Sequence, residues 1–111
     1  MSTFQDRSNR IIRLTDERQT HLETAHPEMR NQLPRIADTL KEPEKVLRSR
    51  TDPQVELFYK WYPTSPVTSK FLCGVVKAIP HAPFMLTAYY TDTAKQGVLL
   101  QRFRHTPAPT A

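Results

Sequence analysis

Hydrophobic residues recur at three- and four-residue spacing in the first third of the chain, which predicts helices there. Thr15 is a good N-cap because its hydroxyl can accept a backbone N–H, and Asp16 and Glu17 follow in the first turn, where acidic residues are favoured. The inward-facing positions of this helix are predicted to be Leu22, Ala25 and Met29. Pro27 disfavours a helical His26, so the helix ends or bends there.

A second helix is predicted over residues 32–42. Pro34 is tolerated in its first turn, and Pro43 closes it. Its apolar stripe consists of Leu33, Ile36, Ala37 and Leu40. Ahead of the first helix, residues 10–14 are predicted to form a short strand.

The spacing changes from residue 45 onward, where alternating residues predict strands over residues 45–50, 54–62, 69–79 and 84–91. In the second of these strands, one face carries Val55, Leu57, Tyr59 and Trp61, and the other carries Glu56, Phe58, Lys60 and Tyr62. Short links join the last three strands, which favours an antiparallel meander. Residues 95–104 fit a strand, a helix or an extended arm equally well.

These elements predict an α+β fold with one or two N-terminal helices packed on a curved, mainly antiparallel sheet of about four strands. The chain has 111 residues, 38% of them hydrophobic, which suffices for a single core. We expect one domain over residues 10–104, a flexible N-terminus at residues 1–9 and a flexible C-terminal tail at residues 105–111.

Composition excludes several classes of site. Only two glycines are present, so a glycine-rich phosphate loop is excluded, and the single Cys73 excludes an intrachain disulfide and a cysteine-based zinc site. No apolar run is long enough to span a bilayer and the first residues lack a secretory signal, so we expect a soluble, cytoplasmic protein with no membrane partner. The net charge of +5 favours anionic partners such as nucleic acid or acidic protein surfaces.

Several short motifs resemble the BECR-type nucleases, a superfamily of barnase-like, EndoU-like, colicin-like and RelE-like ribonucleases that includes small phage-associated members. The resemblance covers roughly residues 10–97 and rests on residues 13–18 (RLTDER), His21, residues 26–28 (HPE), Pro43, residues 48–53 (RSRTDP), Tyr59, residues 75–77 (VVK) and residues 87–92 (TAYYTD). It implies metal-independent RNA cleavage on a concave sheet face. That face would be lined by a helical or post-helical polar residue, basic strand residues and a late Ser, Thr or Tyr.

Such cleavage needs a base, an acid and fixed positive charge at the phosphorane, and it yields a 2′,3′-cyclic phosphate and a 5′-hydroxyl. His26 and His21 are the candidates for proton transfer, since an imidazole has an unperturbed pKa of about 6.5. On one continuous helix they would lie roughly 140° apart, so only a break at Pro27 lets His26 turn toward a common site. Alternatively, His26 caps the helix and His21 is a surface residue.

Arg48 and Arg50 alternate with Ser49, so both point to one side of their strand and could hold a phosphate. Alternatively, they are solvated charges that protect an edge strand. Lys60 and Tyr62 share a strand face and could hold the RNA backbone and stack on bases. Tyr90 or Thr91 could complete the site, although β-propensity alone also explains them.

We therefore predict a toxin-like, metal-independent endoribonuclease that uses neither a metal nor a cofactor. Its predicted catalytic residues are His26, His21, Arg50, Tyr90 and Thr91, and its predicted substrate-binding residues are Arg48, Lys60 and Tyr62. The alternative is a catalytically inactive RNA- or protein-binding member of the same fold. A third hypothesis is a subunit whose edge strand pairs with another chain. RNA is the expected partner, while the RNA target, an antitoxin or other protein partner and the oligomeric state stay open.

Overall fold

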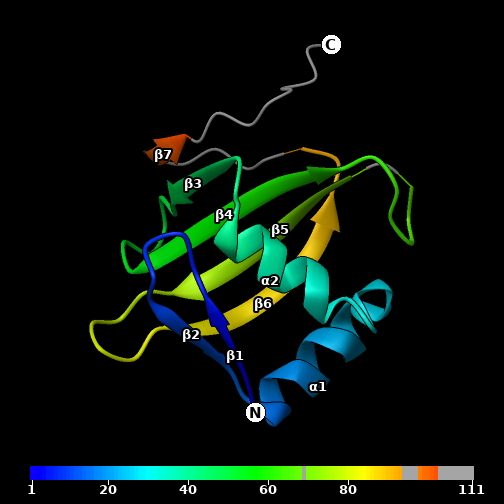
Figure 1. The fold of residues 1–111 in the computed structure, drawn as a ribbon, viewed down its shortest axis with the longest axis horizontal. Helices are drawn as coiled ribbons and strands as arrows, with labels where there is room; N and C mark the ends of the chain where they lie inside the picture. The colour runs from blue at the N-terminus through cyan, green and yellow to red at the C-terminus, as the bar shows by residue number, and fades with distance from the viewer. Residues whose placement is uncertain (69, 94–97, 103–111) are drawn as a thin grey trace.

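The computed structural model describes residues 1–68, 70–93 and 98–102. Its elements, labelled in Figure 1, are β1 (Ser2–Gln5), β2 (Ile11–Leu14), α1 (Asp16–Ala25), the 3₁₀ turn η1 (Pro27–Met29), α2 (Leu33–Lys41), β3 (Lys45–Arg48), β4 (Val55–Tyr62), β5 (Lys70–Lys77), β6 (Phe84–Thr91) and β7 (Val98–Arg102). The α+β class and both predicted helices are confirmed. Among the described residues, no helix is long and apolar enough to cross a bilayer.

The described strands form one mixed sheet in the order β1-β2-β6-β5-β4-β3-β7. The meander β4-β5-β6 is antiparallel, as predicted, and only the pairing of β2 with β6 is parallel. The prediction of about four strands is wrong, because seven strands pair in this sheet within the described residues. The additional strands at both edges are short, so their own sequences carry little periodic signal.

The N-terminus is not the flexible segment that its polar sequence predicts. Residues 2–5 form β1, which pairs with β2 in the antiparallel register Ser2↔Leu14 to Gln5↔Ile11. Phe4 is buried in the core from this strand. At the other end of the chain, β7 shows that a strand forms within residues 95–104, while the predicted flexible tail at residues 105–111 lies outside the described residues.

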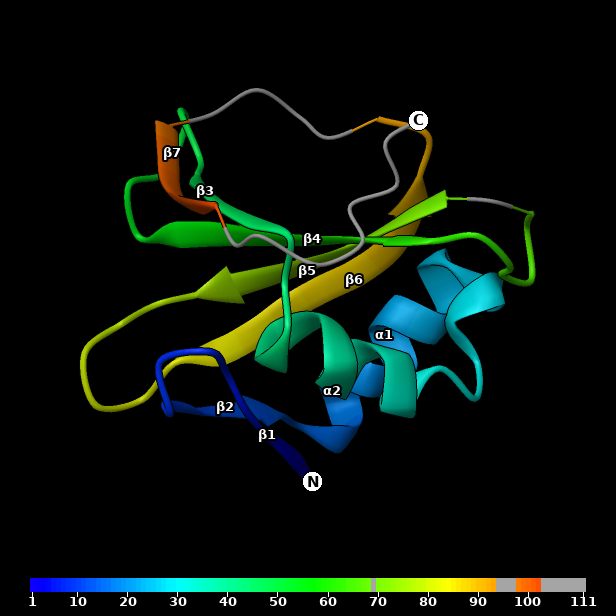
Figure 2. The same ribbon diagram turned by 45° about the horizontal axis from the view of Figure 1, so that its top comes forward.

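Both helices pack on the same face of the sheet, which we call the helix face; the opposite face is the second face (Figure 2). Leu22 of α1 and Ile36 and Leu40 of α2 pack there on buried side chains of the central strands, namely Phe58, Leu72, Val76, Met85 and Ala88. Ala25, predicted to face inward, is exposed because α1 ends at this residue and Met29 enters the core from η1 instead.

A separate apolar cluster occupies the second face. It contains Leu47, Val55, Leu57, Tyr59 and Cys73, which confirms that Val55, Leu57 and Tyr59 share one side of β4. On the helix face of the same sheet, Gly74 brings α2 close to β5: a Cβ there would lie 3.3 Å from Cδ2 of Leu40. The central strands are thus buried on both faces, and Leu40 sits over the least bulky point of the sheet.

We predict that Leu40→Ala lowers the free energy of unfolding by about 2–5 kcal/mol, because it leaves a cavity between α2 and the central strands. Urea denaturation followed by circular dichroism measures this loss. Lys41→Ala, at the neighbouring exposed position of α2, should change the unfolding free energy by less than about 0.5 kcal/mol. Equal losses in the two variants would contradict the central role of Leu40.

Candidate functional site

The end of α1 places His26 at the rim of β6. The His26 backbone N–H donates to the Leu22 carbonyl at 2.8 Å, and its non-helical backbone (φ −132°, ψ 79°) turns the chain out of the helix into η1. Its imidazole then lies against the ring of Tyr89 on β6, with ring centroids 5.4 Å apart. Nδ1 of His26 is 3.8 Å from a carboxylate oxygen of Glu28. We call His26, Glu28 and Tyr89 the His26 cluster.

The His26 cluster combines a partly exposed imidazole with a neutral phenol. The His26 side chain is 35% exposed, against 22% for Glu28. Burial raises the pKa of Tyr89, and the neighbouring Cys73 side chain on β5 raises it further. Tyr89 therefore keeps its proton at neutral pH and offers the imidazole an aromatic face. The cluster thus holds a partly exposed imidazole beside a carboxylate and an aromatic ring.

Three other predicted site residues meet on the helix face, where α2 crosses the end of β4. Asp38 accepts a hydrogen bond from the Tyr62 hydroxyl at 2.6 Å and pairs with Lys60 Nζ at 2.8 Å. The Arg35 guanidinium lies over the Tyr62 ring, 4.6 Å from its centroid, and Nη1 of Arg35 is 3.5 Å from the Tyr90 hydroxyl. We call this set, Arg35, Asp38, Lys60, Tyr62 and Tyr90, the Arg35 network.

The hydroxyls of the Arg35 network are engaged within the fold. Tyr90 is only 8% exposed and donates to Oε1 of Gln32 at 2.6 Å. Burial, followed by the hydrogen bond to the Asp38 carboxylate, raises the pKa of Tyr62. The network thus fastens α2 to β4 and β6, and Lys60 and Asp38 form its more open side, 20% and 43% exposed.

The structure does not bring Arg48 and Arg50 to His26. Arg48 ends β3 opposite Glu56, whereas Tyr90 lies level with Lys60 at the other end of the sheet. Four residues along β4 and three strand spacings separate Arg48 from Tyr90, or roughly 20 Å between Cα atoms at standard strand geometry. Figure 1 shows the β3–β4 connection and the end of α1 on opposite sides of the molecule.

The remaining predicted residues lie apart from His26 or at the edge of its cluster. His21 is exposed in the middle of α1. Thr91 is two residues beyond Tyr89, and its hydroxyl donates to the Thr93 carbonyl at 3.1 Å. Arg50 is exposed in the bend after β3, and neither it nor Arg48 has an ion-pair partner within the described parts of the chain.

Sequence reasoning missed Glu28, Tyr89, Arg35 and Asp38. Alternation in residues 84–91 places Tyr89 and Tyr90 on opposite faces of their strand. Only the position of η1 decides which tyrosine meets His26. Glu28 was visible two residues after His26, whereas Arg35 and Asp38 carried no local signal because their partners lie on β4 and β6.

Comparison of the chain with protein-family models, with curated proteins and with solved structures gives no significant match. The resemblance to BECR-type ribonucleases therefore stays a prediction from the sequence motifs.

Removal of the Tyr62 hydroxyl should weaken the joint between α2 and β4. We predict that Tyr62→Phe lowers the free energy of unfolding by about 1.5–3 kcal/mol at pH 7, the usual size of a hydrogen bond to a charged group.

The same substitution should also change the alkaline behaviour. The folded-state pKa of Tyr62 is raised above the unfolded value of about 10. Its contribution is therefore complete below pH 10 and is lost as the pH rises further. Urea titrations of both proteins at pH 7 and pH 11 should show a smaller difference at pH 11. A difference that does not change with pH would contradict this assignment.

Proposed function

We propose that the protein is a metal-independent endoribonuclease-like enzyme that cleaves single-stranded RNA through a 2′,3′-cyclic phosphate, with His26 moving the protons. The observation that supports this proposal is the His26 cluster. It holds a partly exposed imidazole between a carboxylate and an aromatic ring at the rim of the sheet. An imidazole is the side chain best suited to gain and lose a proton near neutral pH.

In this proposal the two nitrogens of His26 have separate tasks. Because Nδ1 faces Glu28, Nε2 is the nitrogen that takes the proton of the ribose 2′-hydroxyl. The freed oxygen attacks the adjacent phosphorus and displaces the 5′-oxygen of the next nucleotide. That oxygen leaves with the proton held by His26, and the products are a cyclic phosphate and a 5′-hydroxyl. Glu28 stabilises the imidazolium formed between the two transfers.

Cleavage should therefore require His26 but no divalent cation. We expect His26→Ala to slow cleavage of single-stranded RNA in excess EDTA by about 10²- to 10⁴-fold, the usual contribution of one general acid–base group. The measurement is the appearance of cyclic-phosphate ends, with folding checked by circular dichroism.

His81→Asn is the matched control for His26→Ala. His81 is exposed in the β5–β6 turn with φ 68°, a backbone conformation that asparagine adopts readily. This variant should cleave at the wild-type rate. Equal rates for the wild type and His26→Ala would rule out His26 as the proton-transfer group.

A second candidate function is RNA binding without cleavage, and the position of the arginines favours it. A phosphorane needs fixed positive charge close to the proton-transfer group. Arg48 and Arg50 lie at the opposite end of the sheet, where they can hold a phosphate backbone without taking part in its cleavage.

Binding through these arginines should show in the salt dependence. We expect the double variant Arg48→Ala/Arg50→Ala to make the plot of log affinity against log salt less steep by about 1.4, or about 0.7 for each cation lost on single-stranded RNA. Fluorescence anisotropy with labelled RNA measures this slope. Lys41→Ala removes an exposed cation from α2 and should leave the slope unchanged. Equal slopes for the wild type and the double variant would exclude these arginines from the interface.

A further inference from the structure

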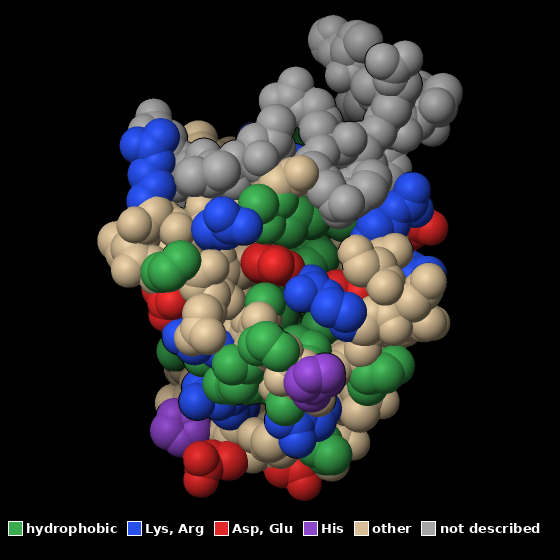
Figure 3. Space-filling view, turned by 90° about the vertical axis from the view of Figure 1, so that its left-hand side faces the viewer, with side chains coloured by type: hydrophobic (Ala, Val, Ile, Leu, Met, Phe, Trp, Pro, Cys, Tyr) green, Lys and Arg blue, Asp and Glu red, His purple; other side chains and the backbone are tan. Residues whose placement is uncertain are grey.

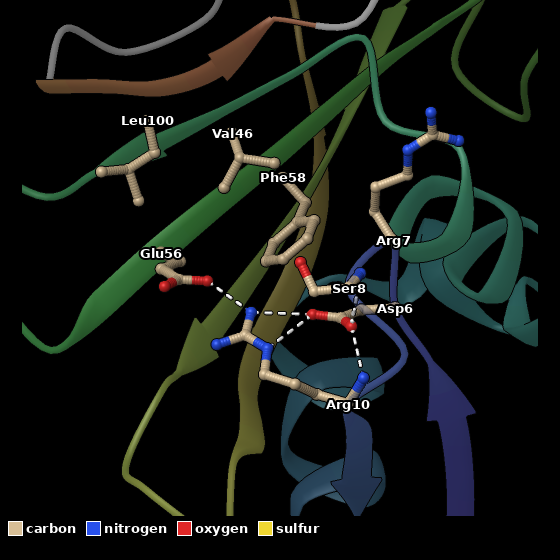
Figure 4. Close-up of a pocket in the computed structure, with 8 residues that line it drawn as sticks. All are labelled: Asp6, Arg7, Ser8, Arg10, Val46, Glu56, Phe58 and Leu100. Atoms are coloured by element: carbon tan, nitrogen blue, oxygen red, sulfur yellow. Dashed lines mark hydrogen bonds and ion pairs between the residues drawn. The ribbon is translucent and has the colours of Figure 1, made fainter.

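A cavity of about 280 Å³ lies between the β1–β2 hairpin and the helix face of β3, β4 and β7 (Figure 4). Its apolar wall consists of Val46, Phe58 and Leu100, and its charged wall of Asp6, Arg10 and Glu56. Arg7 and Ser8, from the tip of the hairpin, complete the lining. Figure 3 shows that Lys and Arg side chains on the adjoining face are interspersed with carboxylates and do not form one basic field. A ligand of the cavity would therefore be recognised by single side chains of its lining and not by a continuous basic surface.

The charged wall holds one guanidinium in a fixed orientation. Asp6, only 1% exposed, accepts hydrogen bonds from Nε of Arg10 at 2.8 Å and from the backbone N–H groups of Ser8 at 3.0 Å and Arg10 at 2.8 Å. Nη2 of Arg10 lies 2.7 Å from Asp6 and 2.6 Å from Oε1 of Glu56. Burial alone would lower the pKa of Arg10, but the two carboxylates outweigh it and raise that pKa.

Two polar atoms of this wall are left available to a ligand. Within the described residues, no hydrogen bond or ion pair engages Nη1 of Arg10 or Oε2 of Glu56. The two side chains remain 34% and 20% exposed. A donor and an acceptor thus flank the Arg10–Glu56 hydrogen bond. The partly buried side chain of Leu100 lines the cavity beyond them, as Figure 4 shows, whereas Phe58 below it is buried in the core.

We propose that this cavity binds one nucleobase, whose edge bonds Arg10 and Glu56 and whose ring packs on the partly exposed Leu100. Each nucleobase carries neighbouring hydrogen-bond donors and acceptors on one edge of a flat ring, which is the complement of this wall. The volume lies near the lower limit of about 300 Å³ for ligand pockets, so it suits a single ring system. Arg7 at the mouth, 46% exposed and 3.5 Å from Glu42, is placed to meet an attached phosphate.

The proposal deepens the proposed action on RNA and rests on it for its physiological ligand. The cavity lies at the arginine-bearing end of the sheet, so the base it holds would belong to a nucleotide away from the bond that His26 cleaves. The same chemistry also fits a free nucleotide, and the experiment separates the two sources.

The first measurement is isothermal titration calorimetry of the four nucleoside 5′-monophosphates and of ribose 5-phosphate. The protein is the His26→Ala variant, because it should not cleave the RNA used in the later titrations. We expect saturable binding of at least one nucleotide and at least tenfold weaker binding of ribose 5-phosphate, which lacks the base. Adding Glu56→Gln should weaken nucleotide binding at least tenfold. Glu17→Gln, which removes an exposed carboxylate on α1, should not weaken it.

A second variant keeps the test decisive if Glu56→Gln disturbs the Arg10 pairing and the fold. Ser8→Trp fills the mouth from the exposed hairpin tip and should also abolish nucleotide binding. The same titration with single-stranded RNA hexamers of one nucleotide type tests whether the base comes from an RNA strand. If the hexamer binds more tightly than the mononucleotide and Ser8→Trp weakens that binding, the base in the cavity belongs to an RNA strand. If the hexamer and the mononucleotide bind equally tightly, the ligand is a free nucleotide.

Absence of saturable binding by every nucleotide and hexamer, or binding unaffected by both cavity variants, would overturn the inference. Cleavage assays on Ser8→Trp with His26 intact separate this result from a failure of the proposed function. Cleavage that persists without base binding rejects the cavity and leaves the ribonuclease proposal standing. Base binding without cleavage would instead support the cavity and reject the ribonuclease proposal.

Discussion

The packing of Leu40 over Gly74 is the contact on which the rest of the structure depends. The missing side chain of Gly74 lets α2 approach the central strands closely. That approach brings Arg35 and Asp38 to the tyrosines of β4 and β6. The carbonyl of Leu40 also accepts the Arg7 N–H at 2.9 Å. One residue of α2 thus joins the sheet, the helix and the hairpin that forms the cavity.

The short pairing between β2 and β6 decides where the His26 cluster forms. These strands meet only at the pair Arg13↔Phe84, so most of the outer edge of β6 is not paired with β2. The chain leaves β2 for α1 and returns through η1 alongside this edge. His26 is therefore held against Tyr89 by backbone geometry at the end of a helix.

The sheet separates two kinds of chemistry. One end carries the imidazole, carboxylate and phenol of the His26 cluster. The other carries Arg48, Arg50 and the Arg10–Glu56 wall. Phosphate and base recognition at one end and proton transfer at the other would require an RNA strand to run across the molecule. Under the proposed function, this layout fits a long RNA strand better than a dinucleotide.

The sequence by itself determined the features that depend on neighbouring residues. Thr15 caps α1 as predicted, and its hydroxyl accepts the Arg18 N–H. Alternation also assigned the faces of β4 correctly, because strand periodicity is a local property. Tertiary structure alone decided that the polar N-terminus forms β1, that Tyr89 rather than Tyr90 meets His26, and that Arg48 lies far from both. Strand order and register join residues distant in the chain, and no local pattern specifies those pairings.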